Sequence, residues 1–302
     1  MGGEVICNLV LAAQDVVGES IVWDSRRKRL VWVDIIGRRI HALDPLTGAH
    51  QIWPMAGRPT SIGLCSDGRA ILGLERHICL WDWQGEPVPV VEVEPELPSN
   101  RLNEGVVGPD GAYWVGTMQN NINDDDGPRD ISSATGAIHR YTIDGGLRRV
   151  CNDHFGITNT FAFPSNHEII TADTLVNKIY SYEIGAEGQL GARRELSSGF
   201  PRGLPDGSCL DAAGRLWTAR VCGGGCLTSI TPDGRVDRVV ELPCSWPTSC
   251  TFGGLDFSTL YVTSARFTMT PEHLAAHPEE GALLGLDIGI QGRPANLFGA
   301  HS

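Results

Sequence analysis

The sequence repeats one pattern about every 41 to 56 residues, and this spacing constrains the fold more than any other feature. Each copy has a few apolar residues, a turn with Asp or Asn and Gly, an apolar pair, and a second strand ending in a β-turn. We call the first residue of each copy its entry residue; the six are Glu19, Thr60, Asn103, Asn159, Asp206 and Thr248. Because this spacing is typical of a four-stranded propeller blade, the repeats predict one six-bladed β-propeller domain over residues 1–302, without a linker.

Local composition predicts the same all-β class. Runs such as 29–34, 70–74 and 168–172 are rich in β-branched and aromatic residues, and turn residues flank them. The 37 Gly and 18 Pro supply these turns, and residues 271–277 form the one helix-like patch, interpreted as a short insertion. Strands and helices do not alternate, which excludes a parallel α/β sheet.

Charge and hydropathy exclude several functions. The 24 Lys and Arg against 36 Asp and Glu give a net charge of -12, so a nucleic-acid partner is not expected. No apolar run approaches the roughly 20 residues that cross a bilayer, and the N-terminal residues do not resemble a secretion signal. The sequence therefore predicts a cytoplasmic protein that binds neither nucleic acid nor membrane, as a monomer or homodimer.

Nine cysteines, an odd number, are expected to be reduced thiols. Cys222 and Cys226 flank three glycines, but a zinc ribbon needs a second pair and a redox site prefers two intervening residues. We therefore expect both to be small buried side chains beside a glycine turn.

Four of the entry residues are carboxylates or amides, although the strands that they begin are otherwise apolar. Asn103, Asn159 and Asp206 each lie eleven residues before the aligned apolar residue of the next strand. Glu19 lies twelve before its equivalent, the extra residue falling in the basic turn 26–29. Equivalent positions in a pseudo-symmetric propeller face the same axis, so these side chains are expected to converge at the mouth of the channel.

Converging carboxylates would repel one another and lose solvation, and a divalent cation removes both costs. Glu19, Asn159 and Asp206 offer oxygen ligands only, which suits Ca²⁺, Mg²⁺ or Mn²⁺, although Zn²⁺ also binds three oxygens plus waters. The sequence thus predicts one divalent cation. The alternative is that these Asn and Asp residues serve turns at strand entry.

Several motifs together resemble the SMP-30/gluconolactonase/LRE (regucalcin-like) family, which includes bacterial sugar lactonases. They are Gly18-Glu19-Ser20, the segments 101–105, 116–118, 157–159 and 204–208, and the pair 252–254 and 260–264. The resemblance runs from about residue 19 to 286 and implies a six-bladed propeller with one divalent cation. It implies that Glu19, Asn159 and Asp206 are the metal ligands and that Arg101 and Asn103 contact substrate.

Two residues depart from the family pattern. Glu104 stands where the family usually has Asp, and Thr160 where it usually has Gly. Both leave the preceding Asn unchanged, so they bear on the pocket lining rather than on metal binding. The acidic, amide-rich segment 119–126 lies where the family places a substrate-facing polar residue, and Asn121 is the candidate. The alternative is an exposed flexible loop.

These features predict metal-dependent hydrolysis of a sugar (aldono-) lactone to the aldonic acid in carbohydrate catabolism. Asp206 or Glu19 would act as general base, Arg101 would bind sugar hydroxyls or an acidic substituent, and Asn103 would orient hydroxyls. A substrate bearing a 6-sulfonate would need a second cation, for which Arg202 is the candidate.

Two alternatives to the lactonase stay open. One is a calcium-binding regulatory propeller, and the other is a related metal-dependent esterase or phosphotriesterase. A serine hydrolase is not indicated, because the sequence lacks Gly-x-Ser-x-Gly.

Overall fold

A computed structural model describes residues 5–300 and shows six four-stranded antiparallel sheets; in five of them the strands pair in chain order. One of them gains a fifth strand. The predicted all-β class and the six blades of a β-propeller are confirmed. The chain divides into two compact units, residues 5–54 with 200–295 and residues 55–199 with 296–300, and each contains three sheets. The single domain inferred from the repeats stays a prediction.

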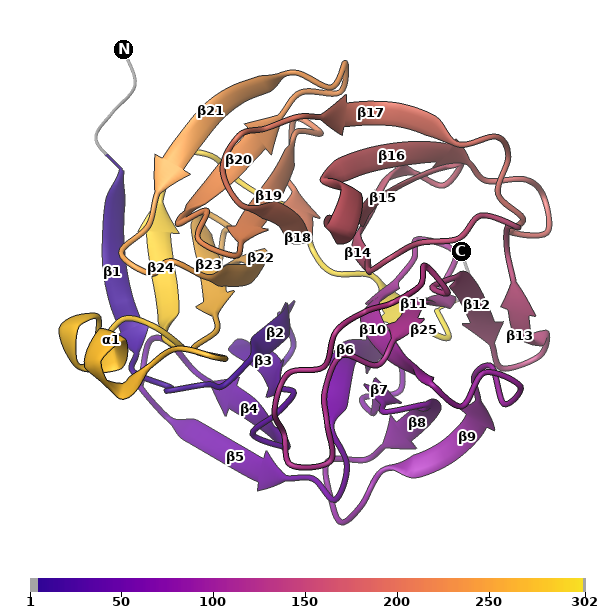
Figure 1. Ribbon diagram of the computed structural model, residues 1–302, viewed down its shortest axis with the longest axis horizontal. Coiled ribbons are helices and arrows are strands. Elements are labelled where there is room, and N and C mark those ends of the chain that lie inside the picture. Colours follow the sequence, from indigo (N-terminus) through magenta and orange to yellow (C-terminus); the bar gives the residue numbers. More distant parts are fainter. Residues whose placement is uncertain (1–4, 301–302) are drawn as a thin grey trace. The chain divides into compact units, whose positions relative to one another are not determined.

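The first unit holds three sheets, whose strand order can be followed in Figure 1. The first sheet consists of β2 (Gly18–Asp24), β3 (Arg29–Asp34), β4 (Arg39–Leu43) and β5 (His50–Pro54). The second consists of β18 (Leu204–Leu210), β19 (Leu216–Val221), β20 (Cys226–Ile230) and β21 (Val236–Glu241). The third consists of β22 (Pro247–Gly253), β23 (Thr259–Ser264), β24 (Leu283–Asp287) and β1 (Ile6–Leu11).

The second unit holds the other three sheets. The first consists of β6 (Pro59–Cys65), β7 (Ala70–Leu74), β8 (His77–Trp81) and β9 (Val88–Glu92), with β25 (Leu297–Phe298) added parallel to β6. The second consists of β10 (Asn100–Val107), β11 (Tyr113–Gln119), β12 (Ile138–Thr142) and β13 (Gly146–Arg149). The third consists of β14 (Thr158–Ser165), β15 (Glu168–Asp173), β16 (Lys178–Glu183) and β17 (Arg194–Ser198).

Two short helices interrupt the strands. The 3₁₀ turn η1 (Thr174–Val176) joins β15 to β16 and is capped by the side chain of Asp173. The helix α1 (Pro271–Ala276) confirms the predicted insertion, with Thr270 as its N-cap and Pro at its first position, a residue order that favours helix initiation. Neither helix, among residues 5–300, has the length and apolar character that spanning a membrane requires.

The first and last strands of the third sheet come from opposite ends of the sequence. Strand β1 pairs antiparallel with β24, with Cys7 opposite Leu286, so the N-terminal segment supplies the outermost strand of a sheet otherwise built from 247–287. The repeat pattern did not assign this role to residues 6–11, because β1 lies before the first copy.

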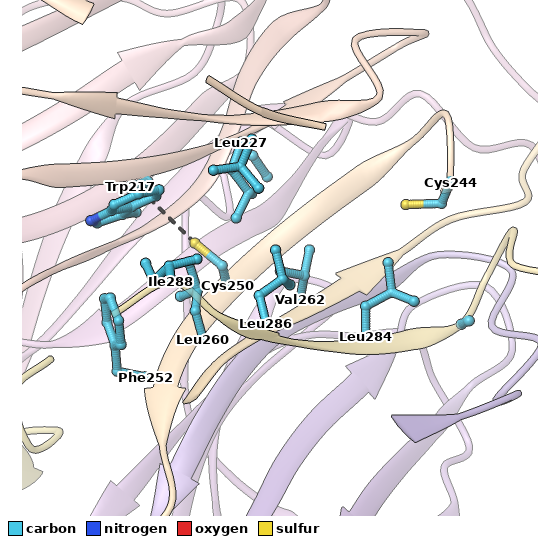
Figure 2. Packing of buried hydrophobic residues seen from close by; sticks show 13 residues of the cluster. Trp217, Leu227, Cys244, Cys250, Phe252, Leu260, Val262, Leu284, Leu286 and Ile288 are labelled. Atoms are coloured by element: carbon cyan, nitrogen blue, oxygen red, sulfur yellow. Dashed lines mark hydrogen bonds between the residues drawn. The ribbon is translucent and has the colours of Figure 1, made fainter. Parts of the chain in front are cut away.

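Apolar side chains fill the space between neighbouring sheets. Trp32, Trp114 and Trp217 lie at strand centres and are fully buried, as expected for packing between blades rather than for a surface platform. Figure 2 shows one such cluster, in which Trp217 packs beside Cys250 and Phe252, and the thiol of Cys250 donates to the Trp217 carbonyl oxygen at 3.3 Å.

All nine cysteines are free thiols, as predicted. The expected burial of the Cys222 and Cys226 pair is half wrong: Cys226 is buried in β20, but Cys222 is exposed. Strand β19 ends at Val221, and Cys222 starts the turn with a left-handed φ of 59°, which turns its side chain away from the sheet.

A buried histidine makes the stability of the second unit depend on pH. His139, in β12, lies with its Nε2 3.8 Å from Glu94 Oε1, and burial lowers its pKa to about 4. The unfolded state binds the proton at a higher pH, near 6.5, so the stabilising contribution is present above pH 6.5 and is lost as pH falls towards 4.

We therefore expect His139→Gln to reduce the acid sensitivity of folding. Between pH 7.5 and pH 5, the His139 contribution to the free energy of unfolding should fall by about 2 kcal/mol in the wild type and be absent in the variant. Urea unfolding at both pH values measures the difference. His167→Gln, in an exposed turn, is the control, and equal pH dependence of the two variants would contradict the assignment.

Candidate functional site

The first strand of each of the six sheets carries a β-bulge at its entry residue. The register shifts fall between Glu19 and Val22, Pro59 and Ser61, Leu102 and Gly105, Asn159 and Ala162, Pro205 and Ser208, and Pro247 and Ser249. A bulge leaves a residue outside the ladder and redirects its side chain. The entry residues thus share a backbone irregularity. In the sequence, this irregularity is visible only as a polar residue at the start of an apolar strand.

Two residues after entry positions adopt a left-handed backbone. Ser20 follows Glu19 with a φ of 50°, and Thr160 follows Asn159 with a φ of 57°. For a β-branched residue this conformation costs about 1–2 kcal/mol, and such strain is concentrated at functional sites. It also explains why the family usually has Gly at the position of Thr160: glycine adopts this φ without strain.

Two entry side chains bond to the start of the first strand of a neighbouring sheet. The Thr248 hydroxyl donates to the carbonyl oxygen of Gly18, the residue before Glu19. Asn103 Nδ2 likewise donates to the carbonyl oxygen of Thr158, the residue before Asn159, at 2.9 Å. In each unit, therefore, one entry side chain fixes the strand start that carries a neighbouring predicted ligand.

The second unit brings four of the predicted site residues into one hydrogen-bonded chain. Asn103 Nδ2 lies 3.2 Å from Asn159 Oδ1, and Asn103 Oδ1 accepts a bond of 2.9 Å from Arg101 Nη1. Arg101 Nη2 donates in turn to Asn121 Oδ1 at 2.9 Å. These residues come from β10, β14 and the loop after β11, so segments up to 58 positions apart in the sequence meet here.

The amide of Asn159 is held in one orientation. Its Nδ2 donates to Thr174 Oγ1 at 2.8 Å, in η1, and its backbone carbonyl accepts from Thr171 Oγ1 at 3.0 Å. Asn159 is buried. Because the NH₂ group is engaged by Thr174, the amide oxygen is the atom presented on the side of Asn103, where one of its two lone pairs is used.

The loop 120–135, between β11 and β12 in Figure 1, is tied down along its length. Arg58 lies just before β6; its Nη2 lies 2.6 Å from Asp126 Oδ1 and donates to the Asn123 carbonyl oxygen at 3.0 Å. Gln119 Oε1 accepts from the backbone N–H of Ser132 at 2.7 Å. The polar segment around Asn121 thus makes hydrogen bonds to residues on both sides of it, and the substrate-facing role of Asn121 stays a prediction.

The first unit holds the two predicted carboxylate ligands on β2 and β18, both of which contact β22. Glu19 Oε2 accepts from the backbone N–H of Ser20 at 2.9 Å. Asp206 is buried. Partial desolvation by the surrounding chain raises the pKa of the Cys222 thiol to about 11, and the negative charge of Asp206 adds to the effect, so the thiol stays protonated near the carboxylate.

Two other charged residues differ from what the sequence suggested. Arg202 forms two bonds of 2.8 Å to the carboxylate of Glu241, so its charge is already neutralised and it is poorly suited to a substrate sulfonate. Glu104 is buried, and burial raises its pKa to about 7, while its Oε1 accepts from the Gly105 N–H at 3.1 Å. The carboxyl group of Glu104 is therefore partly protonated near neutral pH.

The predicted ligands suit a hard cation by the chemistry of their donor atoms. Glu19 and Asp206 supply carboxylate oxygens and Asn159 an oriented amide oxygen, the ligand types that Ca²⁺, Mg²⁺ and Mn²⁺ prefer. Among residues 5–300, no three His, Cys, Asp or Glu side chains are placed to hold a metal ion together. The predicted set contains two such residues and one amide.

The blades and the polar entry residues define a propeller of the sugar-lactonase type. Residues 17–266 match the model of the SMP-30/Gluconolactonase/LRE-like region. The chain belongs to this family.

Among its relatives is 6-deoxy-6-sulfogluconolactonase of Pseudomonas putida, 33% identical over 96% of this chain and 97% of the relative. Regucalcin of Oryctolagus cuniculus is 30% identical over 92% of this chain and 93% of the relative. A crystal structure of a calcium-binding protein, regucalcin, from Agrobacterium tumefaciens superimposes with a TM-score of 0.87 at 27% identity, covering 97% of each chain.

We expect Arg58→Met to loosen the loop 120–135. The substitution removes the charge-assisted bonds to Asp126 and Asn123, worth about 1.5–3 kcal/mol locally, so backbone amides of 121–128 should exchange with deuterium at least about tenfold faster. Hydrogen exchange read by mass spectrometry measures this. Arg69→Met is the matched control, since Arg69 pairs with Asp67 in an exposed turn of the same unit; unchanged exchange in Arg58→Met would contradict the clamp.

Proposed function

We propose that this protein is a metal-dependent lactonase that opens a sugar (aldono-) lactone to the aldonic acid. The observation that carries the proposal is the hydrogen-bonded chain from Asn121 through Arg101 and Asn103 to Asn159. It joins the proposed substrate-binding residues to a proposed metal ligand. Family membership and the P. putida sulfogluconolactonase support the lactone as the substrate class.

Glu19, Asn159 and Asp206 are proposed to hold one divalent cation, Ca²⁺, Mg²⁺, Mn²⁺ or Zn²⁺. The calcium-binding protein from A. tumefaciens, with the same fold, supports such an ion. When bound, a divalent cation polarises an ester carbonyl and acidifies water.

The residues of the chain then have separate roles. Asp206, or Glu19, accepts the proton of the attacking water, whose oxygen forms a bond to the carbonyl carbon; the ring C–O bond breaks and its oxygen takes up a proton. Arg101 donates to substrate oxygens through its planar fork, and Asn103 orients a hydroxyl. Because Asn103 and Asn121 fix the Arg101 guanidinium beforehand, substrate binding need not order it.

The sugar is proposed to be an unsubstituted aldonolactone rather than a 6-sulfonated one. Arg202, the second cation that a sulfonate would require, is engaged by Glu241 through two bonds. Arg101 bonds to the neutral amide oxygens of Asn103 and Asn121, so its charge could still bind either a sugar hydroxyl or an acidic substituent. A panel of gluconolactone, xylonolactone, arabinonolactone and 6-deoxy-6-sulfogluconolactone tests this choice, and a higher kcat/KM for the sulfonated lactone would overturn it.

Asp206→Ala and Asn159→Ala should each lose cation binding and lactonase activity together. Removing one oxygen ligand leaves the cation with too few donors, so we expect kcat/KM to fall by at least about 10²-fold, or 2.7 kcal/mol in transition-state stabilisation. Calorimetric titration with Ca²⁺ and Mn²⁺ and lactone hydrolysis followed with a pH indicator measure both. Asp237→Ala, on the outer strand β21, is the control, and full activity in either ligand variant would reject the mechanism.

Thr174→Val should weaken cation binding without touching a ligand. The change keeps the size of the side chain but removes the hydroxyl that accepts from Asn159 Nδ2, so the amide is free to rotate. Loss of such an outer partner typically costs 10–100-fold in metal affinity. Thr174→Ser, which keeps the hydroxyl, should bind as the wild type does, and equal losses in both variants would indicate a packing effect instead.

A calcium-binding regulatory propeller is the second candidate, favoured by the names of the regucalcin relatives. A chelator experiment separates the two. Turnover that disappears on removal of the cation and returns only with it supports the lactonase. A protein that binds Ca²⁺ but hydrolyses neither sugar lactones, an aryl ester nor a phosphotriester supports the regulator, and preferred cleavage of either of the last two supports the esterase alternative.

A further inference from the structure

A cavity lies in the unit of residues 55–199 and 296–300, on the connections between strands. Its volume is about 510 Å³, and it is lined by residues 149–153 and 189–193. The first segment leads from β13 to β14, and the second from β16 to β17. A hydrogen bond of 2.8 Å from the Leu190 N–H to the Val150 carbonyl oxygen joins the two segments. Cavities of this size hold small-molecule ligands.

Arg193 is fixed in this cavity by stacking on aromatic rings. Its guanidinium carbon lies 4.7 Å from the centre of the Tyr180 ring and 5.9 Å from that of Phe155. Stacking holds the guanidinium by its faces and leaves its N–H groups directed outward in the plane.

Arg149 is fixed from the other segment by backbone oxygens. Its Nε donates to the Cys151 carbonyl oxygen at 2.9 Å, and its Nη2 donates to the Asp153 carbonyl oxygen at 3.2 Å. Both acceptors are neutral, so these bonds orient the guanidinium without cancelling its charge.

The carboxylate of Asp153 only partly offsets the two arginines. Its Oδ2 accepts from the Tyr182 hydroxyl at 2.9 Å, and its Oδ1 lies 4.0 Å from Arg193. The cavity lining therefore carries one net positive charge, from two arginines and one aspartate, in a chain whose net charge is -12. A chain this acidic repels anions overall, so a preorganised pair of guanidiniums is the feature that would select one locally.

We propose that this cavity binds a small metabolite through an oxyanion group, a carboxylate or a phosphate. Each guanidinium is oriented by its own neighbours and can donate charge-assisted hydrogen bonds to such a group, and the amides of Asn152 and Gln189 on the same lining suit hydroxyls of the ligand. The site is independent of the proposed lactonase centre, since it shares no residue with it.

Calorimetric titration of the full-length protein with inorganic phosphate, gluconate and citrate, at constant ionic strength, tests the proposal. The wild type should bind at least one of them. Comparison of the phosphate titration with the gluconate and citrate titrations distinguishes a phosphate from a carboxylate ligand. Arg193→Met should weaken binding at least about tenfold, the loss expected when charge-assisted hydrogen bonds are removed.

Arg148→Met is the matched control, because Arg148 is next to Arg149 but lies outside the cavity, with an exposed side chain near Glu187. It should bind as the wild type does. If Arg193→Met does not fold, the exposed Arg149→Met makes the same test. Absence of binding by the wild type at up to about 20 mM of all three anions, or equal weakening by Arg148→Met and Arg193→Met, would overturn the proposal.

Discussion

The structure depends on one backbone irregularity that is repeated in every blade: the bulge at the start of the first strand. It interrupts the ladder at Asn103 and Asp206 and directly after Glu19 and Asn159, so a polar side chain can begin a strand that is otherwise packed in the core. The same bulge allows Asn103 and Thr248 to reach the carbonyl oxygens of neighbouring strand starts. Stability between blades and the placement of the proposed ligands thus have a common cause, and the left-handed Ser20 and Thr160 are its local cost.

Around this frame, the residues of the proposed substrate side are hydrogen-bonded to one another. Arg101 is held between Asn103 and Asn121, and the loop that carries Asn121 is itself held by Arg58. An arginine ordered by neutral amides keeps its charge and loses little freedom on binding, which is the condition for efficient orientation of a substrate. The neutral Asn121 also means that the charge of Arg101 is not consumed by this neighbour, in contrast to Arg202, which Glu241 neutralises.

The cavity beside Arg149 and Arg193 shows the same physical device with other partners. There, carbonyl oxygens and aromatic faces replace the amides, and the guanidiniums are oriented while Asp153 offsets only part of their charge. In both places an arginine lies in a strongly acidic chain. The negative net charge repels anions, so the fixed positive group decides where an anionic or polar ligand binds. The proposed lactonase centre and the proposed anion site would therefore recognise substrate and metabolite by similar chemistry on different segments.

The spacing of the repeats and the apolar alternation determined the number of blades, the all-β class and most strand positions. A strand with one buried face has apolar residues at every second position, so its burial is visible in the sequence. The polar residues at 19, 103, 159 and 206 were identifiable for the same reason, as exceptions to that period. The sequence could not indicate that β1 completes the last sheet, that Cys222 faces outward, or that Arg58 and Thr174 support Asn121 and Asn159. Those contacts join residues far apart in the chain or depend on a single φ angle, and only the packing of the folded blades decides them.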